Sequence, residues 1–197
     1  LLKNLGLVIG RAKFNVFAAR AEELIEGRPE LVAAIGPLLD ARKAIEHHVG
    51  DLDRKVLKLA RHDVQVRRFM TAPGVGPITA LCFKATIGDP TRFNRSRSVG
   101  AYLGLTTRRH SSGEIDWSGR ISKCGDAMLR TYLFEAANVL LTRVPKWSAL
   151  KAWGMKLAKR SGLRKAKVAV ARKLAVILHR MWIDGTEFTW STKKAAA

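Results

Sequence analysis

Apolar residues recur at helical spacing along most of the chain, and one stretch lacks that periodicity. The pattern predicts helices over residues 14–26, 98–103, 126–141, 146–160 and 163–183. Two further helices begin at Pro29 and just after Gly76. We expect Gly36 and Pro37 to break or kink the first of these two. Residues 106–121 are rich in serine, glycine and arginine, which predicts a loop or a β-hairpin. The predicted fold class is therefore mainly all-α.

The pattern divides the chain into a helical spacer at residues 1–70, a domain at residues 71–190 and a tail at residues 191–197. The spacer holds a heptad seam of apolar side chains, interrupted by Arg42. The seam consists of Leu38, Ile45, Val49, Leu52, Val56 and Leu59. It fits one arm of a helical hairpin within one chain, or a coiled coil between two copies. The expected partner on this surface is a second copy of the chain.

Two glycines, Gly74 and Gly76, alternate with Pro73, Val75 and Pro77 just before an apolar helix. Glycine can take a positive φ or let another backbone approach closely. A helix that starts after such a turn directs free N–H groups into the gap, and such a terminus binds phosphate. This is the arrangement of a helix-hairpin-helix, which holds a nucleic-acid backbone without reading bases. The alternative is an ordinary corner between two helices.

Positive charge is concentrated in the second part of the chain. The formal net charge is +20, and residues 71–197 hold 23 basic and 7 acidic residues, against 13 and 9 in residues 1–70. Such a field attracts polyanions. The last helix has six basic residues and no acidic residue before Asp184, so we expect phosphate contact rather than simple solvation. These basic residues are Arg164, Lys165, Lys167, Arg172, Lys173 and Arg180.

Other features of the composition narrow the class of protein. No run of about 18 apolar residues is present, so we expect no transmembrane helix and no membrane partner. The two cysteines, Cys82 and Cys124, lie in regions predicted to be helical. They favour reduced packing residues in a cytoplasmic protein over a disulfide or a metal pair.

The stretch without periodicity holds the candidate chemistry. Ser112 precedes Gly113 and follows Arg108 and Arg109. A serine hydroxyl is a weak nucleophile that needs a nearby base or a positive setting. Arginine forks next to it could hold the non-bridging oxygens of a phosphate. The alternative is a polar Ser-Gly turn in a basic protein.

Three carboxylates in the same region, Glu114, Asp116 and Asp126, could hold Mg²⁺. Asp126 also suits the cap of the helix that follows it. Glu114 and Asp116 can pair with neighbouring arginines. With no further acidic cluster in support, we expect no metal site in this chain.

Six motifs occur in an order that resembles the transposases of insertion-sequence family 110, the IS116/IS110/IS902 type. The resemblance covers nearly all of residues 71–190. The motif segments are 72–77, 87–93, 101–105, 112–113, 121–126 with 129–130, and 171–175. At Glu114–Trp117 the chain departs from the family, which has a second glycine and basic residues there. That departure leaves Ser111 and Ser122 as rivals of Ser112.

The resemblance implies a DNA recombinase in which Ser112 attacks a DNA phosphate, guided by a structured RNA. It also implies an RNase-H-like (RuvC-like) domain ahead of this chain, where Mg²⁺ would bind. We therefore expect this chain alone to be inactive, in a bacterial or archaeal cytoplasm. The alternative is a non-catalytic helix-hairpin-helix module. The expected contacts with DNA or RNA are Gly74, Gly76, Arg108, Arg109, Lys123, Arg130, Arg164, Lys165, Lys167, Arg172 and Lys173.

Overall fold

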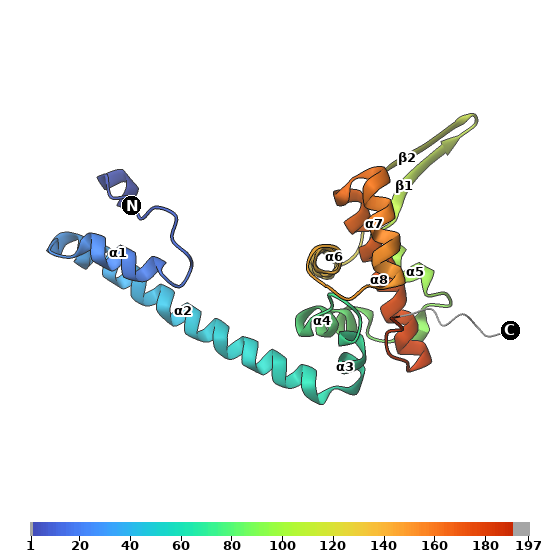
Figure 1. Ribbon diagram of the computed structural model, residues 1–197, viewed down its shortest axis with the longest axis horizontal. Coiled ribbons are helices and arrows are strands. Elements are labelled where there is room, and N and C mark those ends of the chain that lie inside the picture. The colour runs from blue at the N-terminus through green and yellow to red at the C-terminus, as the bar shows by residue number, and fades with distance from the viewer. Residues whose placement is uncertain (1, 191–197) are drawn as a thin grey trace. The chain divides into compact units, whose positions relative to one another are not determined.

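The computed structural model describes residues 2–190, the coloured part of the ribbon in Figure 1. The chain forms two compact units that divide between Lys55 and Val56, inside one long helix. The boundary predicted from the sequence, after residue 70, lies further along the chain than this division. The tail predicted for residues 191–197 lies outside the described residues.

The first unit is built from two helices. It contains a short 3-10 helix, Leu2–Leu5, helix α1, Phe17–Ile25, and most of helix α2, Pro29–His62. Ala21 and Ile25 of α1 are buried, as is Ile35 of α2. These three side chains form the small apolar core of this unit.

Arg42, the residue that interrupts the heptad seam, is part of α2 and contacts the segment around α1. Its guanidinium carbon lies 4.7 Å from the ring centroid of Phe14 and 5.0 Å from that of Phe17. Its Nη2 also donates a hydrogen bond of 2.7 Å to the carbonyl of Phe14. An arginine over two aromatic faces is a favourable cation–π arrangement. Arg42 therefore interrupts the seam and at the same time links α2 to the segment that holds Phe14 and Phe17.

Helix α2 continues through Pro37, so of the expected break or kink at Gly36 and Pro37 the break is wrong. Proline removes one N–H from the helical ladder. The residues on either side, Ala33, Ala34, Leu38 and Leu39, are among the strongest helix formers. Local propensity therefore maintains the helix across the missing hydrogen bond.

The heptad seam of α2 lies open on the single chain. Leu38, Ile45, Val49, Leu52 and Leu59 each expose half or more of their surface. Water contact with so much apolar surface is unfavourable, at about 25 cal/mol for each Å². The seam is therefore a surface that the chain itself does not cover.

The second unit is mainly helical, with one β-hairpin in the stretch predicted as a loop or a hairpin. Its elements are α3 (Val64–Met70), α4 (Pro77–Ile87), a 3-10 helix (Pro90–Arg92), α5 (Arg97–Tyr102), β1 (Thr107–Ser112), β2 (Ile115–Ile121), α6 (Ala127–Thr142), α7 (Ala149–Ser161) and α8 (Leu163–Asp184). The predicted fold class, mainly all-α, is confirmed. The sequence did not separate α3 from the long helix before it.

Helix α8 is the central element of this unit. It packs against α3, α5, α6, α7 and the 3-10 helix. The β1–β2 hairpin projects away from these helices, as Figure 1 shows. The two strands form a two-stranded antiparallel sheet. The hairpin is therefore anchored to the unit at its base.

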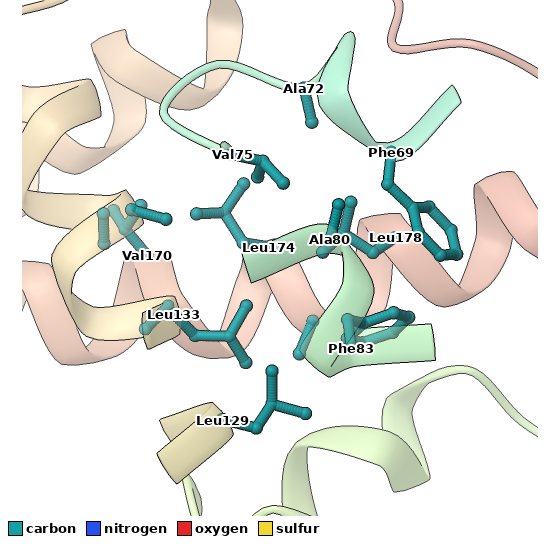
Figure 2. Close-up of a cluster of buried hydrophobic side chains, with 14 of the residues drawn as sticks. Phe69, Ala72, Val75, Ala80, Phe83, Leu129, Leu133, Val170, Leu174 and Leu178 are labelled. Carbon is teal, nitrogen blue, oxygen red and sulfur yellow. The ribbon is translucent and has the colours of Figure 1, made fainter. Parts of the chain in front are cut away.

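Side chains from α3, α4, α6 and α8 meet in the core, where Figure 2 shows them pointing toward one another. Phe69 and Phe83 stack edge to face, with ring centroids 5.2 Å apart, and Phe69 meets Trp182 in the same way at 5.4 Å. Leu133 and Leu174 are fully buried beside them. Burial of each such side chain contributes about 1.5–3 kcal/mol, so this cluster is the main source of stability for the unit.

Two polar contacts fix helices to one another. Asp63 caps α3, accepting hydrogen bonds from the backbone N–H groups of Gln65 and Val66 at 2.9 and 3.0 Å, and it forms an ion pair with Lys84 of α4. Burial raises the pKa of Asp63, but the hydrogen bonds from Lys84 and Val66 lower it further, so its pKa lies below the ordinary value. This carboxylate therefore joins α3 to α4.

Buried His179 of α8 makes the second contact. One ring nitrogen lies 2.9 Å from the carbonyl of Pro90 and the other 3.0 Å from Oγ of Ser96. A carbonyl only accepts, so Nε2 donates to Pro90, and the Ser96 hydroxyl is the partner of Nδ1. This imidazole holds the segment ahead of α5 against α8.

Candidate nucleic-acid interface

Ser112 lies at the exposed tip of the β-hairpin. It is the last residue of β1 and pairs with Ile115, so Gly113 and Glu114 form a two-residue turn between the strands. Gly113 has φ +54°, the left-handed conformation that tight hairpin turns require. The turn therefore presents the Ser112 hydroxyl to solvent at the far end of the hairpin.

Successive residues of a strand point to opposite faces of the hairpin, and this separates Ser112 from Ser111 and Arg109. Ser111 pairs with Asp116, so these two residues share a face with Arg109, while Ser112 belongs to the opposite face. Arg109 donates to both carboxylate oxygens of Asp116, at 2.8 Å from Nε and 2.6 Å from Nη2. This bond lowers the pKa of Asp116 and raises that of Arg109. Arg109 is thus paired on the face away from Ser112.

The base of the hairpin is fixed by several backbone contacts. Arg108 donates from Nη2 to the carbonyl of Ser122, 3.2 Å away, and the N–H of Ser122 donates to the carbonyl of Thr106. Gly104, with φ +66°, packs so closely that a Cβ there would lie 2.1 Å from the carbonyl oxygen of Cys124. Arg108 and Ser122 therefore belong to the base, and Ser112 to the tip.

Arg130 of α6 ties the same base together. Its Nη1 donates to the carbonyls of Leu103 at 3.1 Å, Cys124 at 3.3 Å and Asp126 at 3.4 Å. Asp126 in turn caps α6, accepting from the N–H of Leu129 at 2.5 Å. The sequence suggested phosphate contact for Arg130, and in the structure this nitrogen binds the chain's own backbone.

The three carboxylates considered as possible Mg²⁺ ligands, for which no metal site is expected, lie in separate settings. Glu114 is in the turn, Asp116 is paired with Arg109, and Asp126 is a helix cap. Among residues 2–190, no three His, Cys, Asp or Glu side chains gather in a way that could hold a metal ion.

A groove of about 1200 Å³ runs between the hairpin base, α7 and α8. Seven of its lining residues are basic and none is acidic: Arg97, Arg120, Lys123, Arg164, Lys165, Arg172 and Lys173. None of the seven forms an ion pair with a carboxylate of the described residues. Two tryptophans, Trp117 and Trp153, also line it. The groove is thus a positively charged surface with aromatic rings.

The groove gathers five of the basic residues chosen from sequence, and two that sequence reasoning missed. The missed residues are Arg97 and Arg120. Arg120 belongs to β2, three residues after Trp117. Strand alternation alone would place these two residues on opposite faces, so no strand pattern indicated that both line the groove. Arg97 comes to the groove through the packing of α5 on α8, for which the sequence carries no local signal.

Comparison with known proteins identifies the family. Residues 66–153 match the model of the transposase IS116/IS110/IS902 family. The chain is 33% identical over 183 residues to the transposase for insertion sequence element IS1111A of Coxiella burnetii, which covers 90% of this chain and 50% of that protein. It is 34% identical over 184 residues to a probable family 20 transposase of Pseudomonas aeruginosa, covering 90% and 54%. The chain belongs to this transposase family.

A more distant relative of the chain is a pilin gene-inverting protein of Moraxella lacunata, 28% identical over 109 residues, or 54% of this chain and 33% of that protein. The chain spans about half the length of the curated relatives it matches first. None of the helices described at residues 2–190 is long and apolar enough to cross a membrane.

Three other residues expected to contact nucleic acid lie outside the groove lining. Lys167 of α8 lies over the ring of Phe134, with its Nζ 5.8 Å from the centroid. Gly74 packs against the backbone of α6. Gly76 is the N-cap of α4, where no side chain caps the helix, and it has open space where a Cβ would stand.

Proposed function

We propose that this chain is the DNA-binding and serine-bearing part of a transposase that cleaves and rejoins DNA, guided by a structured RNA. Family membership supports the class of reaction. The observation that carries the proposal is the basic groove beside a hairpin that presents Ser112 at its exposed tip. Phosphates bound along the groove would hold the DNA backbone at the base of the hairpin whose tip carries the Ser112 hydroxyl.

In the proposed step, the Oγ of Ser112 bonds to a DNA phosphorus while the bond from that phosphorus to a deoxyribose oxygen breaks. The serine proton passes to a base, and the leaving oxygen takes up a proton. In the hairpin, Arg109 pairs with Asp116 and Arg108 binds the Ser122 carbonyl, so neither arginine is directed to Ser112. We therefore propose that the base and the charge-stabilising groups come from the rest of the full-length protein.

The described residues do not fit a Mg²⁺ site. We propose that Mg²⁺ binds instead in an acidic RNase-H-like domain of the full-length protein, and that this chain alone neither cuts nor joins DNA. We further propose that the exposed seam of α2 joins two copies of the chain, in the cytoplasm of a bacterium or archaeon.

The test uses the full-length protein with its RNA. Ser111→Ala, Ser112→Ala and Ser122→Ala are compared for recombination and for covalent protein–DNA adducts, after each is shown to fold and bind DNA. We expect Ser112→Ala alone to abolish adducts. Adducts that persist in Ser112→Ala and vanish in one of the other variants would move the nucleophile to that serine.

A non-catalytic nucleic-acid-binding module is the second candidate. Arg109 pairs with Asp116 and Arg108 binds the Ser122 carbonyl, and this favours the second candidate because neither arginine is then directed to Ser112. Under this alternative all three variants recombine DNA normally, and Ser112→Ala changes the stability by about 0.5 kcal/mol or less, as most surface substitutions do.

A further inference from the structure

We infer that the groove binds unpaired nucleotides: phosphates lie on the basic side chains of α8 and bases stack on Trp117 and Trp153. This inference rests on the proposed function for the groove's role in nucleic-acid binding, and it adds the form of nucleic acid that binds there. It applies to single-stranded DNA and single-stranded RNA alike, because both offer the same phosphates and flat bases.

The size of the groove fits a polymer. Its volume of about 1200 Å³ exceeds the range of about 300–1,000 Å³ that small-molecule pockets occupy. It is bounded by strand β2, by Trp153 of α7 and by the first four turns of α8. Its volume therefore leaves room for a chain of nucleotides.

The floor of the groove is apolar. Leu105, Ile121, Val168, Ala169 and Val176 line it between the basic residues. The outside of a duplex presents phosphates and hydrated groove edges, and its base faces are stacked inside. An unpaired strand exposes its base faces, which can cover such a floor and gain from leaving water.

Both tryptophans expose part of their surface to solvent. Trp117 is 59% exposed and Trp153 is 44% exposed. The Trp117 ring lies over Gly119, where a Cβ would stand 3.2 Å from ring atom Cη2, so the indole is positioned against its own strand. Indole faces are sequence-tolerant stacking platforms for bases, and each stack contributes substantially to affinity.

The basic side chains of α8 are placed where they can bind the phosphates of a strand whose bases stack on the two tryptophans. Arg172 runs its side chain across Gly100, where a Cβ would lie 2.9 Å from its Cγ, so the absence of a side chain at Gly100 makes room for it. Arg164 and Lys165 lie two turns earlier on α8, and Lys173 follows Arg172. With no acidic residue in the lining, these charges remain available to phosphate.

The test measures anisotropy with labelled oligonucleotides of one base sequence: single-stranded DNA, single-stranded RNA and blunt duplex DNA, all at one salt concentration. We expect at least one single strand to bind more tightly than the duplex. Trp153→Ala should weaken single-strand binding by about 5- to 100-fold and change duplex binding by less than twofold, while Trp153→Phe retains most of the affinity.

The matched control is Trp147→Ala, which removes an indole that is 62% exposed and lies outside the groove. It should leave all affinities unchanged. Duplex binding equal to or tighter than that of both single strands would overturn the inference, as would equal effects of Trp153→Ala and Trp147→Ala. Displacement of the oligonucleotide by polyglutamate with no effect of Trp153→Ala would point to an acidic protein partner, and would also overturn it.

Failure of this inference and failure of the proposed function give different results. If single strands do not bind in preference to duplex but Ser112→Ala still abolishes adducts in the full-length protein, only the form of the bound nucleic acid is wrong. If single-strand binding depends on Trp153 but no adducts form with the unaltered protein, the proposed catalysis is wrong and this inference stands.

Discussion

Gly74 lies so close to Ala136 of α6 that a Cβ added to it would stand 2.2 Å from the Ala136 carbonyl oxygen. Its φ of +81° is also a conformation that other residues rarely adopt. The turn between α3 and α4 is therefore packed directly on the backbone of another helix of the same unit.

We predict that Gly74→Ala destabilises the chain far more than Gly88→Ala. Both positions have positive φ, +81° and +67°, so both substitutions introduce backbone strain, but a Cβ at Gly88 meets open space. The steric contact at Gly74 should lower the free energy of unfolding by about 1–3 kcal/mol more. Urea unfolding followed by circular dichroism measures the difference. Equal losses in the two variants would mean that α6 moves aside freely.

The Asp63–Lys84 pair predicts a pH dependence of stability. Because the folded-state pKa of Asp63 is lowered, its ionised form stabilises the fold above the unfolded-state value of about 3.9. That contribution is lost as pH falls through the folded-state pKa. Asp63→Asn keeps a capping oxygen and loses the charge, so its stability deficit should be largest near neutral pH and shrink in acid.

The pair is partly exposed, so the deficit at neutral pH should be at most about 1 kcal/mol. Thermal unfolding across the acid range measures it. Glu187→Gln, at an exposed carboxylate of the same unit, is the control and should track the unaltered chain at every pH. A deficit of Asp63→Asn that stays constant into acid would contradict the assignment.

We predict that nucleic-acid affinity falls steeply with salt. If about six phosphates are neutralised, the log–log slope is about −5 for duplex and about −4 for a single strand. Lys173→Ala, in the groove, should make the duplex slope shallower by about 0.9. Lys167→Ala, over the Phe134 ring, should leave it unchanged. A flat salt response would remove the basis for phosphate binding.

We predict that the seam of α2 joins copies of the chain. Ile45→Glu combined with Leu52→Glu places two charges on the exposed stripe and should convert an oligomer to monomer. Lys43→Glu, on α2 but off the seam, controls for added negative charge. Light scattering after size-exclusion chromatography gives the mass. A monomeric unaltered chain at high concentration would show that something else covers the seam.

We predict that this chain alone leaves supercoiled DNA intact in Mg²⁺ or Mn²⁺, because phosphoryl transfer on DNA commonly needs a metal clamp and the described residues offer no metal site. Agarose gels would detect nicking. Nicking that copurifies with the chain and disappears in Asp116→Ala would instead favour a nuclease that uses the hairpin carboxylates.

Local signals in the sequence predicted most of the elements. The helix after Pro145, the cap at Asp126 and the pairing of Asp116 with an arginine all follow from residues close in the chain. The close approach at Gly74 was also foreseen, but the approaching backbone is that of α6, more than sixty residues away. The residues of the turn carry no information on which distant helix packs against Gly74.

The candidate site was predictable in its chemistry and less so in its geometry. The cluster of basic residues in the sequence indicated α8. Lys165 and Lys167 are only two residues apart, yet Lys165 lines the groove while Lys167 lies over the ring of Phe134 of α6. Arg109 and Ser112 are three residues apart, which looked close enough to share a phosphate. Strand alternation puts them on opposite faces of the hairpin, and this depended on knowing the register.

Helix α8 supplies Leu174 and Leu178 to the core and Arg172 and Lys173 to the groove. The helix that holds the unit together is therefore also where like charges repel one another, and salt or a bound polyanion relieves that repulsion. A ligand at about 100 times its Kd adds about 2.7 kcal/mol to the stability of the unit it binds. If the groove binds a polyanion as proposed, we expect the unit to be least stable without it and to resist proteolysis better when nucleic acid is supplied.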